Sequence, residues 1–283
     1  MIVIFYKIFA SGGIIQPNPE NMADLSVFGI DQNLGLFLMM LPFLASLIFL
    51  FYLFKPLHSR NFKSLFNGSG NIRWNRFFIS ATIWVLFSAI YLFLDYKLNP
   101  GTYTNNFNMG TFIILCIISF LLIPFQASYE EILFRGYLAQ GIGVRTKSRI
   151  LVILIPSVLF GLMHSLNPEV DSYGFWIVMP QYIFFGLLFG IISVMDDGIE
   201  LAMGAHTANN IFMSIFITSK SSVLQTPAMF LQEKVDPVKD LFVLMIMGFL
   251  FIGFLSILFK WDFRILRAKI VPDPSDINEN SVA

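Results

Sequence analysis

The chain has 283 residues, of which 56% are hydrophobic and 13% charged, and its formal net charge is zero. Its mean hydropathy of +0.73 and its 33 phenylalanines are typical of a multi-pass helical membrane protein and exclude an ordinary soluble domain. The balanced charge argues against nucleic acid as a partner. The single cysteine, Cys116, rules out an internal disulfide and is expected to pack as a small apolar residue.

The apolar segments predict an all-α polytopic membrane bundle with about seven (six to eight) transmembrane helices. The expected helices cover residues 34–54, 77–94, 110–143, 150–164, 175–195, 199–217 and 241–259. The 110–143 segment allows either one long, tilted helix kinked at Pro124 or a short span followed by a separate helix. Within 175–195, Gly186 and Gly190 have the GxxxG spacing that permits close helix contact.

Charge in the connecting segments predicts the orientation. The 55–76 loop, the 145–149 turn and the tail after the last span are rich in Lys and Arg and are expected to be cytoplasmic. The acidic 17–33 segment and the loops 95–109, 166–173 and 218–240 are then outside, although three lysines in the last loop oppose this. Residues 1–16 are apolar but short. An interfacial helix, a cleaved signal and a short span all stay open for them.

Two adjacent carboxylates and a guanidinium lie inside the third apolar segment, where ionisable groups are costly and usually functional. Glu131 and Arg135 are four residues apart with the acid first, as in a helical ion pair. Glu130 faces about 100° away, and its i+4 neighbour, Phe134, cannot neutralise it. We therefore expect Glu130 to find a partner elsewhere in the chain, and the two histidines in apolar segments are the candidates.

Distance along the helices supports this pairing. Glu130 and His164 lie about fifteen residues on either side of the basic 145–149 turn, so antiparallel helices would bring both to roughly 22 Å from it. His206 lies roughly 13 Å from the Asp196-Asp197 turn by the same rule. This depth agrees only roughly with that of Glu130 and His164, and helix tilt or a re-entrant 165–174 segment must account for the difference. Each residue alone has a plainer interpretation as a hydrogen-bonded structural group. Their occurrence together at similar depth favours a functional site.

Three sequence motifs carry a family resemblance. Glu-Glu-x-x-x-Arg at 130–135, Phe-x-x-x-His at 160–164 and His-x-x-x-Asn at 206–210 resemble, in order, the motifs of the CPBP family. This is the CAAX-protease and bacteriocin-processing (Abi) family of intramembrane endopeptidases. The resemblance covers about residues 110–217. It implies a peptide-bond hydrolase buried in a helical bundle, with a peptide or protein substrate in or at the membrane.

The resemblance also divides the chain and suggests roles. We expect an N-terminal region with two spans (1–109), a catalytic helical core (110–217) and a last span with a basic, disordered tail (218–283). Peptide hydrolysis needs an activated water and a stabilised oxyanion. Glu130 is interpreted as the general base assisted by His164, and His206 and Asn210 as donors to the oxyanion. The residues expected in the site are Glu130, Glu131, Arg135, Phe160, His164, His206 and Asn210.

Several alternatives stay open. Glu130, His164 and His206 could instead bind Zn²⁺, although no His-Glu-x-x-His motif supports a metal site. A catalytically idle bacteriocin-immunity or scaffold protein would carry the same motifs. A proton-coupled transporter could use the paired glutamates, but the sequence has none of the internal symmetry that such proteins show. Short loops and the absence of eukaryotic retention signals favour a bacterial cytoplasmic membrane.

Overall fold

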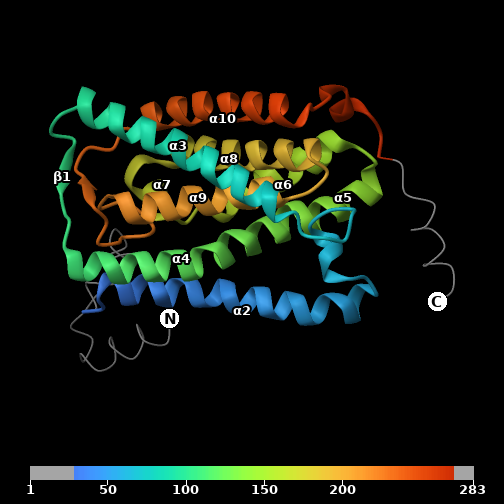
Figure 1. Cartoon of the computed structure of the whole chain (residues 1–283), viewed down its shortest axis with the longest axis horizontal. Helices are drawn as coiled ribbons and strands as arrows, with labels where there is room; N and C mark the ends of the chain where they lie inside the picture. Colours follow the sequence, from blue (N-terminus) through green and yellow to red (C-terminus); the bar gives the residue numbers. More distant parts are fainter. Residues whose placement is uncertain (1–28, 271–283) are drawn as a thin grey trace.

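The computed structural model describes residues 29–270, so the predictions for residues 1–16 and for the end of the tail lie outside the described residues. Within this range the helices run side by side along one direction (Figure 1). The all-α polytopic fold is therefore confirmed. The main helices are α2 (Gln32–His58), α3 (Trp74–Leu98), α4 (Met109–Glu131), α6 (Arg149–Met163), α8 (Phe175–Met195), α9 (Glu200–Phe216) and α10 (Pro237–Phe259).

Five helices among the described residues are long and apolar enough to cross a membrane. One of them is a continuous helix of 38 residues, Met109–Thr146, so the segment is one long helix and not a short span followed by a separate helix. It joins α4 to a π-helical segment, η4 (Ile132–Leu138), and then to α5 (Ala139–Thr146). At ~1.5 Å per residue it would extend about 57 Å, well beyond a ~30 Å hydrocarbon core.

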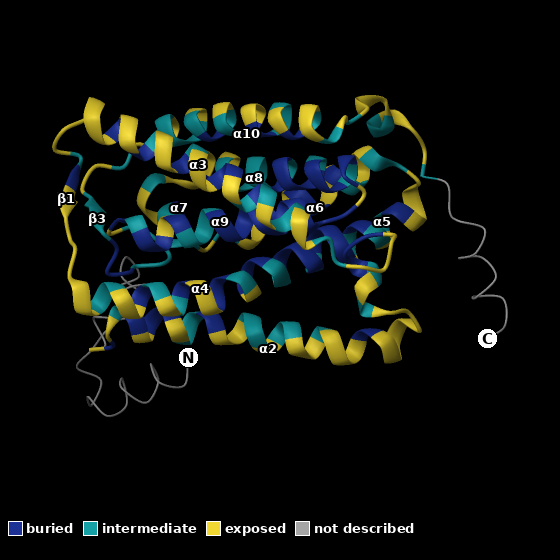
Figure 2. Cartoon of the chain, in the orientation of Figure 1, coloured by how far each residue is buried: buried dark blue, intermediate teal, exposed yellow. Residues whose placement is uncertain are grey.

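The other two expected helices, α6 and α9, are shorter. They have 15 and 17 residues and reach only about 22 and 25 Å. α9 packs against α3, α4 and α8, and Figure 2 shows it buried along most of its length. Most of its polar residues are therefore covered by other helices, and Asn209 and Asn210 are partly covered.

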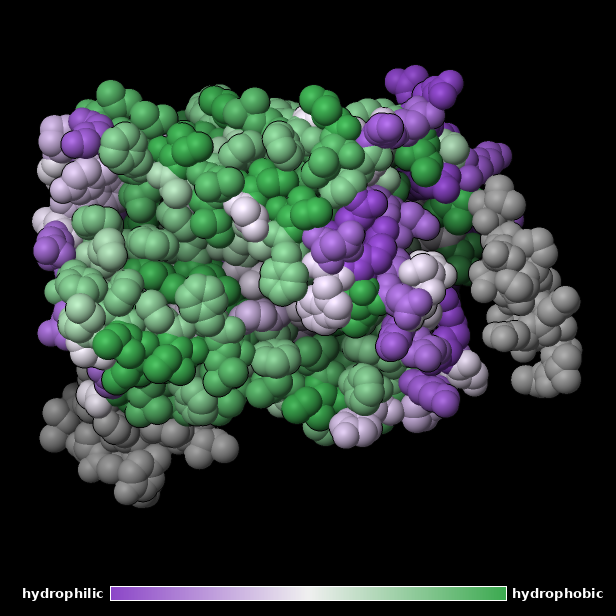
Figure 3. All heavy atoms as spheres, in the orientation of Figure 1, coloured by the Kyte–Doolittle hydropathy of each residue, from purple (hydrophilic) through white to green (hydrophobic). Residues whose placement is uncertain are grey.

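The surface agrees with a membrane location and with the expected clustering of charge. Apolar residues cover most of the face in Figure 3, and hydrophilic residues gather at its right-hand end. The three segments expected to be cytoplasmic all meet at that end (Figure 1). Lys239, one of the lysines that opposed the orientation, is paired with the buried Asp95.

The opposite end carries a small sheet that the sequence did not predict. β1 (Tyr103–Asn105) pairs antiparallel with β3 (Phe230–Gln232), and β3 pairs parallel with β2 (Ile217–Thr218). A short helix, α7 (Pro168–Tyr173), precedes α8. These elements join the ends of the long helices without altering the helical class of the fold.

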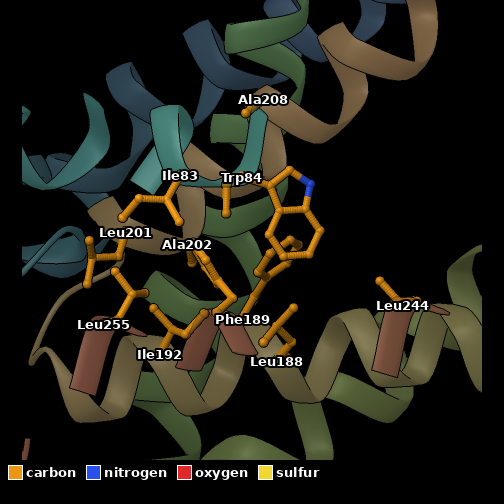
Figure 4. Packing of buried hydrophobic residues seen from close by; sticks show 12 residues of the cluster. Ile83, Trp84, Leu188, Phe189, Ile192, Leu201, Ala202, Ala208, Leu244 and Leu255 are labelled. Atoms are coloured by element: carbon orange, nitrogen blue, oxygen red, sulfur yellow. The ribbon is translucent and has the colours of Figure 1, made fainter. Parts of the chain in front are cut away.

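Close packing fixes the helices that surround α9. Figure 4 shows the largest apolar cluster, in which Trp84 of α3 lies against Phe189 and Leu188 of α8. The predicted glycine contact is also confirmed. A Cβ atom on Gly186 would lie 2.7 Å from both the Cα and the carbonyl oxygen of Ser157, so only glycine lets α6 and α8 approach this closely.

An ion-pair clamp holds the start of α9 to the loop before α3. Arg73 Nη2 lies 2.6 Å from Glu200 Oε2 and 3.2 Å from Asp196 Oδ2. The backbone N–H of Arg73 also donates to Glu200 Oε1 at 3.1 Å. Both acids are buried. The clamp sets the position of α9 and, with it, the polar residues farther along that helix.

The orientation can be tested with single cysteines in a Cys116→Ala background. Ser69 and Lys234 are exposed at opposite ends of the bundle. We expect an impermeant maleimide to label Lys234→Cys in intact cells and to label Ser69→Cys only after cell disruption. The reverse pattern would show that the charge-based orientation is wrong.

The clamp predicts a stability effect. Arg73→Met leaves the buried Glu200 without its guanidinium and leaves Asp196 with only Arg76 Nε at 3.6 Å, so it should destabilise the protein by about 3 kcal/mol in detergent. Thermal unfolding measures this. Arg264→Met removes an ion pair to Asp262 in which the arginine side chain is 92% exposed, and it should not change the melting temperature. Equal effects of the two substitutions would contradict a role for the clamp.

Candidate active site

The two glutamates lie where the long helix changes from α to π geometry. Glu130 and Glu131 end α4, and Arg135 lies in the following π-helical segment. Their exposed fractions are 3%, 0% and 6%. Single π-helical turns within α-helices occur frequently at functional sites. Here the segment carries the guanidinium that faces the buried acid.

Glu131 is held between two donors. Its Oε1 atom accepts hydrogen bonds from Arg135 Nη1 at 3.0 Å and from His206 Nδ1 at 2.7 Å. The predicted ion pair between Glu131 and Arg135 is therefore confirmed. Arg135 also donates from Nη2 to the carbonyl of Gly186 at 3.1 Å, and its guanidinium lies 4.5 Å from the ring centroid of Phe160. The pair thus links α4 and η4 to α9, α8 and α6.

Glu130 has a different environment. Its Oε1 atom accepts from Gln126 Nε2 at 2.6 Å, so the expectation that it lacks a local partner is wrong. The partner lies at i−4, one helical turn before Glu130, and not at the i+4 position of Phe134. Its Oε2 atom is buried without a hydrogen-bond partner among the described residues and lies 3.7 Å from His206 Nε2. One oxygen of this carboxylate is therefore engaged, and the other faces an imidazole.

The two histidines have the same proton arrangement. His164 Nδ1 lies 2.7 Å from the carbonyl oxygen of Phe160, and His206 Nδ1 lies 2.7 Å from the Glu131 carboxylate. Because both of these oxygens accept, each Nδ1 carries a proton. The rings are also held by stacking, on Tyr182 for His164 (4.4 Å) and on Phe189 for His206 (5.2 Å). Each imidazole therefore has its Nε2 atom left for other contacts.

The remaining predicted residues complete the cluster. Phe160 packs against His164 and His206, with ring centroids 4.7 and 6.0 Å apart. Asn210 Nδ2 donates to Gln126 Oε1 at 3.0 Å. The structure thus brings all seven expected residues together, from α4, η4, α6 and α9.

Several residues of this site were not predicted from the sequence. Gln126 had a signal, since it is a polar residue four positions before Glu130 in an apolar segment. Tyr182, Phe189 and the Gly186 carbonyl had none, because they belong to α8 and reach the site only through helix packing.

The donor set was tested as a zinc site. Each histidine uses Nδ1 in a hydrogen bond, which is the arrangement that leaves Nε2 for a metal. Within residues 29–270, however, no three or more His, Cys, Asp or Glu side chains are grouped so that they could hold a metal ion. The described residues do not fit zinc in this arrangement. Zinc binding by Glu130, His164 and His206 stays an untested alternative to the metal-free base.

Comparison with known proteins agrees with the motifs. Residues 109–212 match the family model described as type II CAAX prenyl endopeptidase Rce1-like. The match extends from the start of α4 to residue 212 in α9 and includes all three motifs, so the resemblance found in the sequence is confirmed. We call the matched residues 109–212 the Rce1-like domain. The helices α2, α3 and α10 lie outside it.

A curated relative covers more of the chain than the Rce1-like domain. The uncharacterized protein YyaK of Bacillus subtilis (strain 168) is 29% identical over 242 residues, which are 85% of this chain and 80% of that protein. No solved structure gives a significant match. At the level of the family, the Rce1-like domain indicates a membrane-embedded protease.

The buried charges predict a paired mutational effect. Arg135→Gln leaves Glu131 without its guanidinium and should destabilise the protein by about 3–5 kcal/mol. The double variant Glu131→Gln/Arg135→Gln removes both charges and should recover part of this loss. Thermal unfolding in detergent measures all three proteins. A double variant less stable than Arg135→Gln would contradict the pairing.

Proposed function

We propose that this protein is an intramembrane endopeptidase that hydrolyses a peptide bond of a membrane-associated substrate, with Glu130 as the general base. The observation that carries the proposal is the free Oε2 atom of Glu130, which is buried and faces His206 Nε2 at 3.7 Å. A carboxylate oxygen without a protein donor can accept a proton from water. The Rce1-like domain supports the reaction class.

The steps follow from the hydrogen bonds. Glu130 Oε2 takes a proton from a water molecule, and the water oxygen attacks the carbonyl carbon of the peptide bond. His164 Nε2 accepts a hydrogen bond from the second O–H of that water, which orients the water molecule. The carbonyl electrons move to oxygen, forming the oxyanion. Glu130 then returns its proton to the amide nitrogen as the C–N bond breaks.

The position of His206 supports a role at the oxyanion. Its Nδ1 is engaged by Glu131 and its Nε2 lies 3.7 Å from Glu130 Oε2, so Nε2 is the ring atom that faces the reacting groups. Asn210 uses one amide hydrogen for Gln126 and keeps a second for the same purpose.

The substrate is proposed at the level of chemistry. A prenylated or leader peptide held at the bilayer would reach a site enclosed by membrane helices, and the matched family model is described as a prenyl endopeptidase. We place the protein in the bacterial cytoplasmic membrane on the basis of its span composition and of the relative in Bacillus subtilis.

The test is cleavage of a fluorogenic peptide library by the purified protein in detergent. Glu130→Gln and His164→Ala should each lower kcat by about 10²–10⁴-fold, since each removes a group that handles the proton. Glu169→Gln is a matched control because Glu169 is another carboxylate with one buried oxygen that lacks a hydrogen-bond partner, but it lies in α7. It should retain wild-type activity.

Each preparation is assayed with and without a chelator and with zinc added back. Activity that is lost in both variants but indifferent to chelation supports Glu130 as a metal-free base. Loss on chelation with recovery on zinc addition would overturn the metal-free steps. No cleavage by wild type, together with full cellular function of Glu130→Gln, would replace the protease with the scaffold or immunity function.

A further inference from the structure

A chain of hydrogen bonds connects the apolar core to Glu130. Trp84 Nε1 donates to Asn209 Oδ1 at 3.2 Å, and Asn209 Nδ2 donates to Asn210 Oδ1 at 3.1 Å. Asn210 Nδ2 then donates to Gln126 Oε1 at 3.0 Å, and Gln126 Nε2 donates to Glu130 Oε1 at 2.6 Å. The chain joins α3, α9 and α4.

The direction of this chain is determined at both ends. An indole N–H can only donate, and an ionised carboxylate can only accept. Each amide between them must therefore turn its oxygen toward Trp84 and its nitrogen toward Glu130. The positions of an amide's oxygen and nitrogen follow from its hydrogen-bond partners, and the partners in this chain allow only one assignment.

The Trp84 end of the chain is rigid. Trp84 is 1% exposed, and its ring lies edge-on to Phe251 with centroids 5.1 Å apart. Figure 4 shows its indole nitrogen pointing away from Phe189 and Leu188. A tightly packed ring cannot turn to release its hydrogen bond, so the direction set by Trp84 is maintained at Gln126.

We propose that Gln126, oriented by the Trp84–Asn209–Asn210 chain, is the positioning residue that holds Glu130 Oε1 and leaves Oε2 as the oxygen that reacts with water. This inference rests on the proposed function. Gln126 acts through Glu130 and does not touch the reacting atoms. Without its donor, the carboxylate could rotate, and either oxygen could face Asn210 or His206.

The catalytic test compares Gln126→Met, Trp84→Phe and their double variant in the peptide assay. Gln126→Met keeps the length of the side chain but removes the bond to a charged acceptor, so kcat should fall about 10- to 100-fold with KM unchanged. Trp84→Phe removes the donor that anchors Asn209 Oδ1, so the chain is held only from the Glu130 end, and kcat should fall by about 3- to 10-fold. The kcat of the double variant should be no lower than that of Gln126→Met.

The matched control is Ser119→Ala. Ser119 Oγ and Ser214 Oγ are 3.0 Å apart and buried, so this pair also links α4 to α9 but has no contact with Glu130. Its kcat should stay close to that of the wild type. If Trp84→Phe leaves a cavity that prevents folding, Asn209→Leu breaks the same link while Trp84 remains in the core. If the losses in kcat of the two single variants multiply in the double variant, the proposal is overturned, because the effects of independent sites add in free energy.

A second readout needs no substrate. The infrared carboxylate band of Glu130 is the one lost in Glu130→Gln, and its frequency depends on the hydrogen bonds that the carboxylate accepts. It should shift in Gln126→Met and in Trp84→Phe, and not in Ser119→Ala. An unshifted band in Trp84→Phe would overturn the proposal that Trp84 orients Gln126 through the chain. A shifted band in a protein that cleaves no peptide would uphold the chain while the proposed function fails.

Discussion

The buried contact among Glu131, Arg135 and His206 is the interaction on which the rest of the structure depends. Charges enclosed by apolar helices are tolerated only when they are paired and hydrogen-bonded. Glu131 Oε1 receives both of its donors within 3.0 Å, one from η4 and one from α9. The Gly186 carbonyl adds an anchor in α8. The helices must therefore meet in one arrangement, since any other leaves a charge alone in a dry interior.

This requirement explains why α9 lies at the centre of the bundle. Its side chains at 206, 209 and 210 would be costly against lipid, and other helices bury His206 and partly bury Asn209 and Asn210. The Arg73 clamp at one end of α9 sets its position along the bundle. A substitution at the clamp would therefore act on the site by moving His206, which lies about two helical turns from Glu200, along the bundle.

The two glutamates are neighbours in sequence but differ in what surrounds them. Glu131 accepts from Arg135 and His206 through Oε1, whereas Glu130 accepts from a neutral amide through Oε1. Both Oε2 atoms lack a hydrogen-bond partner among the described residues, and that of Glu130 lies 3.7 Å from His206 Nε2. Adjacent positions on a helix point about 100° apart, so one carboxylate faces the structural pair and the other faces the space beside the histidines. Two identical side chains thus support different roles through their environments.

Much of the architecture was determined by the sequence itself. Apolar runs located the helices, and spacing of four residues identified the Glu131–Arg135 pair, because both depend on contacts local in the chain. The Gln126–Glu130 contact was equally local and could have been found at i−4. The stacking of His164 on Tyr182, the chain from Trp84 and the engagement of Asn210 by Gln126 were decided only by the tertiary structure. Those contacts depend on how helices rotate and slide against one another, and that is set by side-chain packing between segments far apart in the sequence.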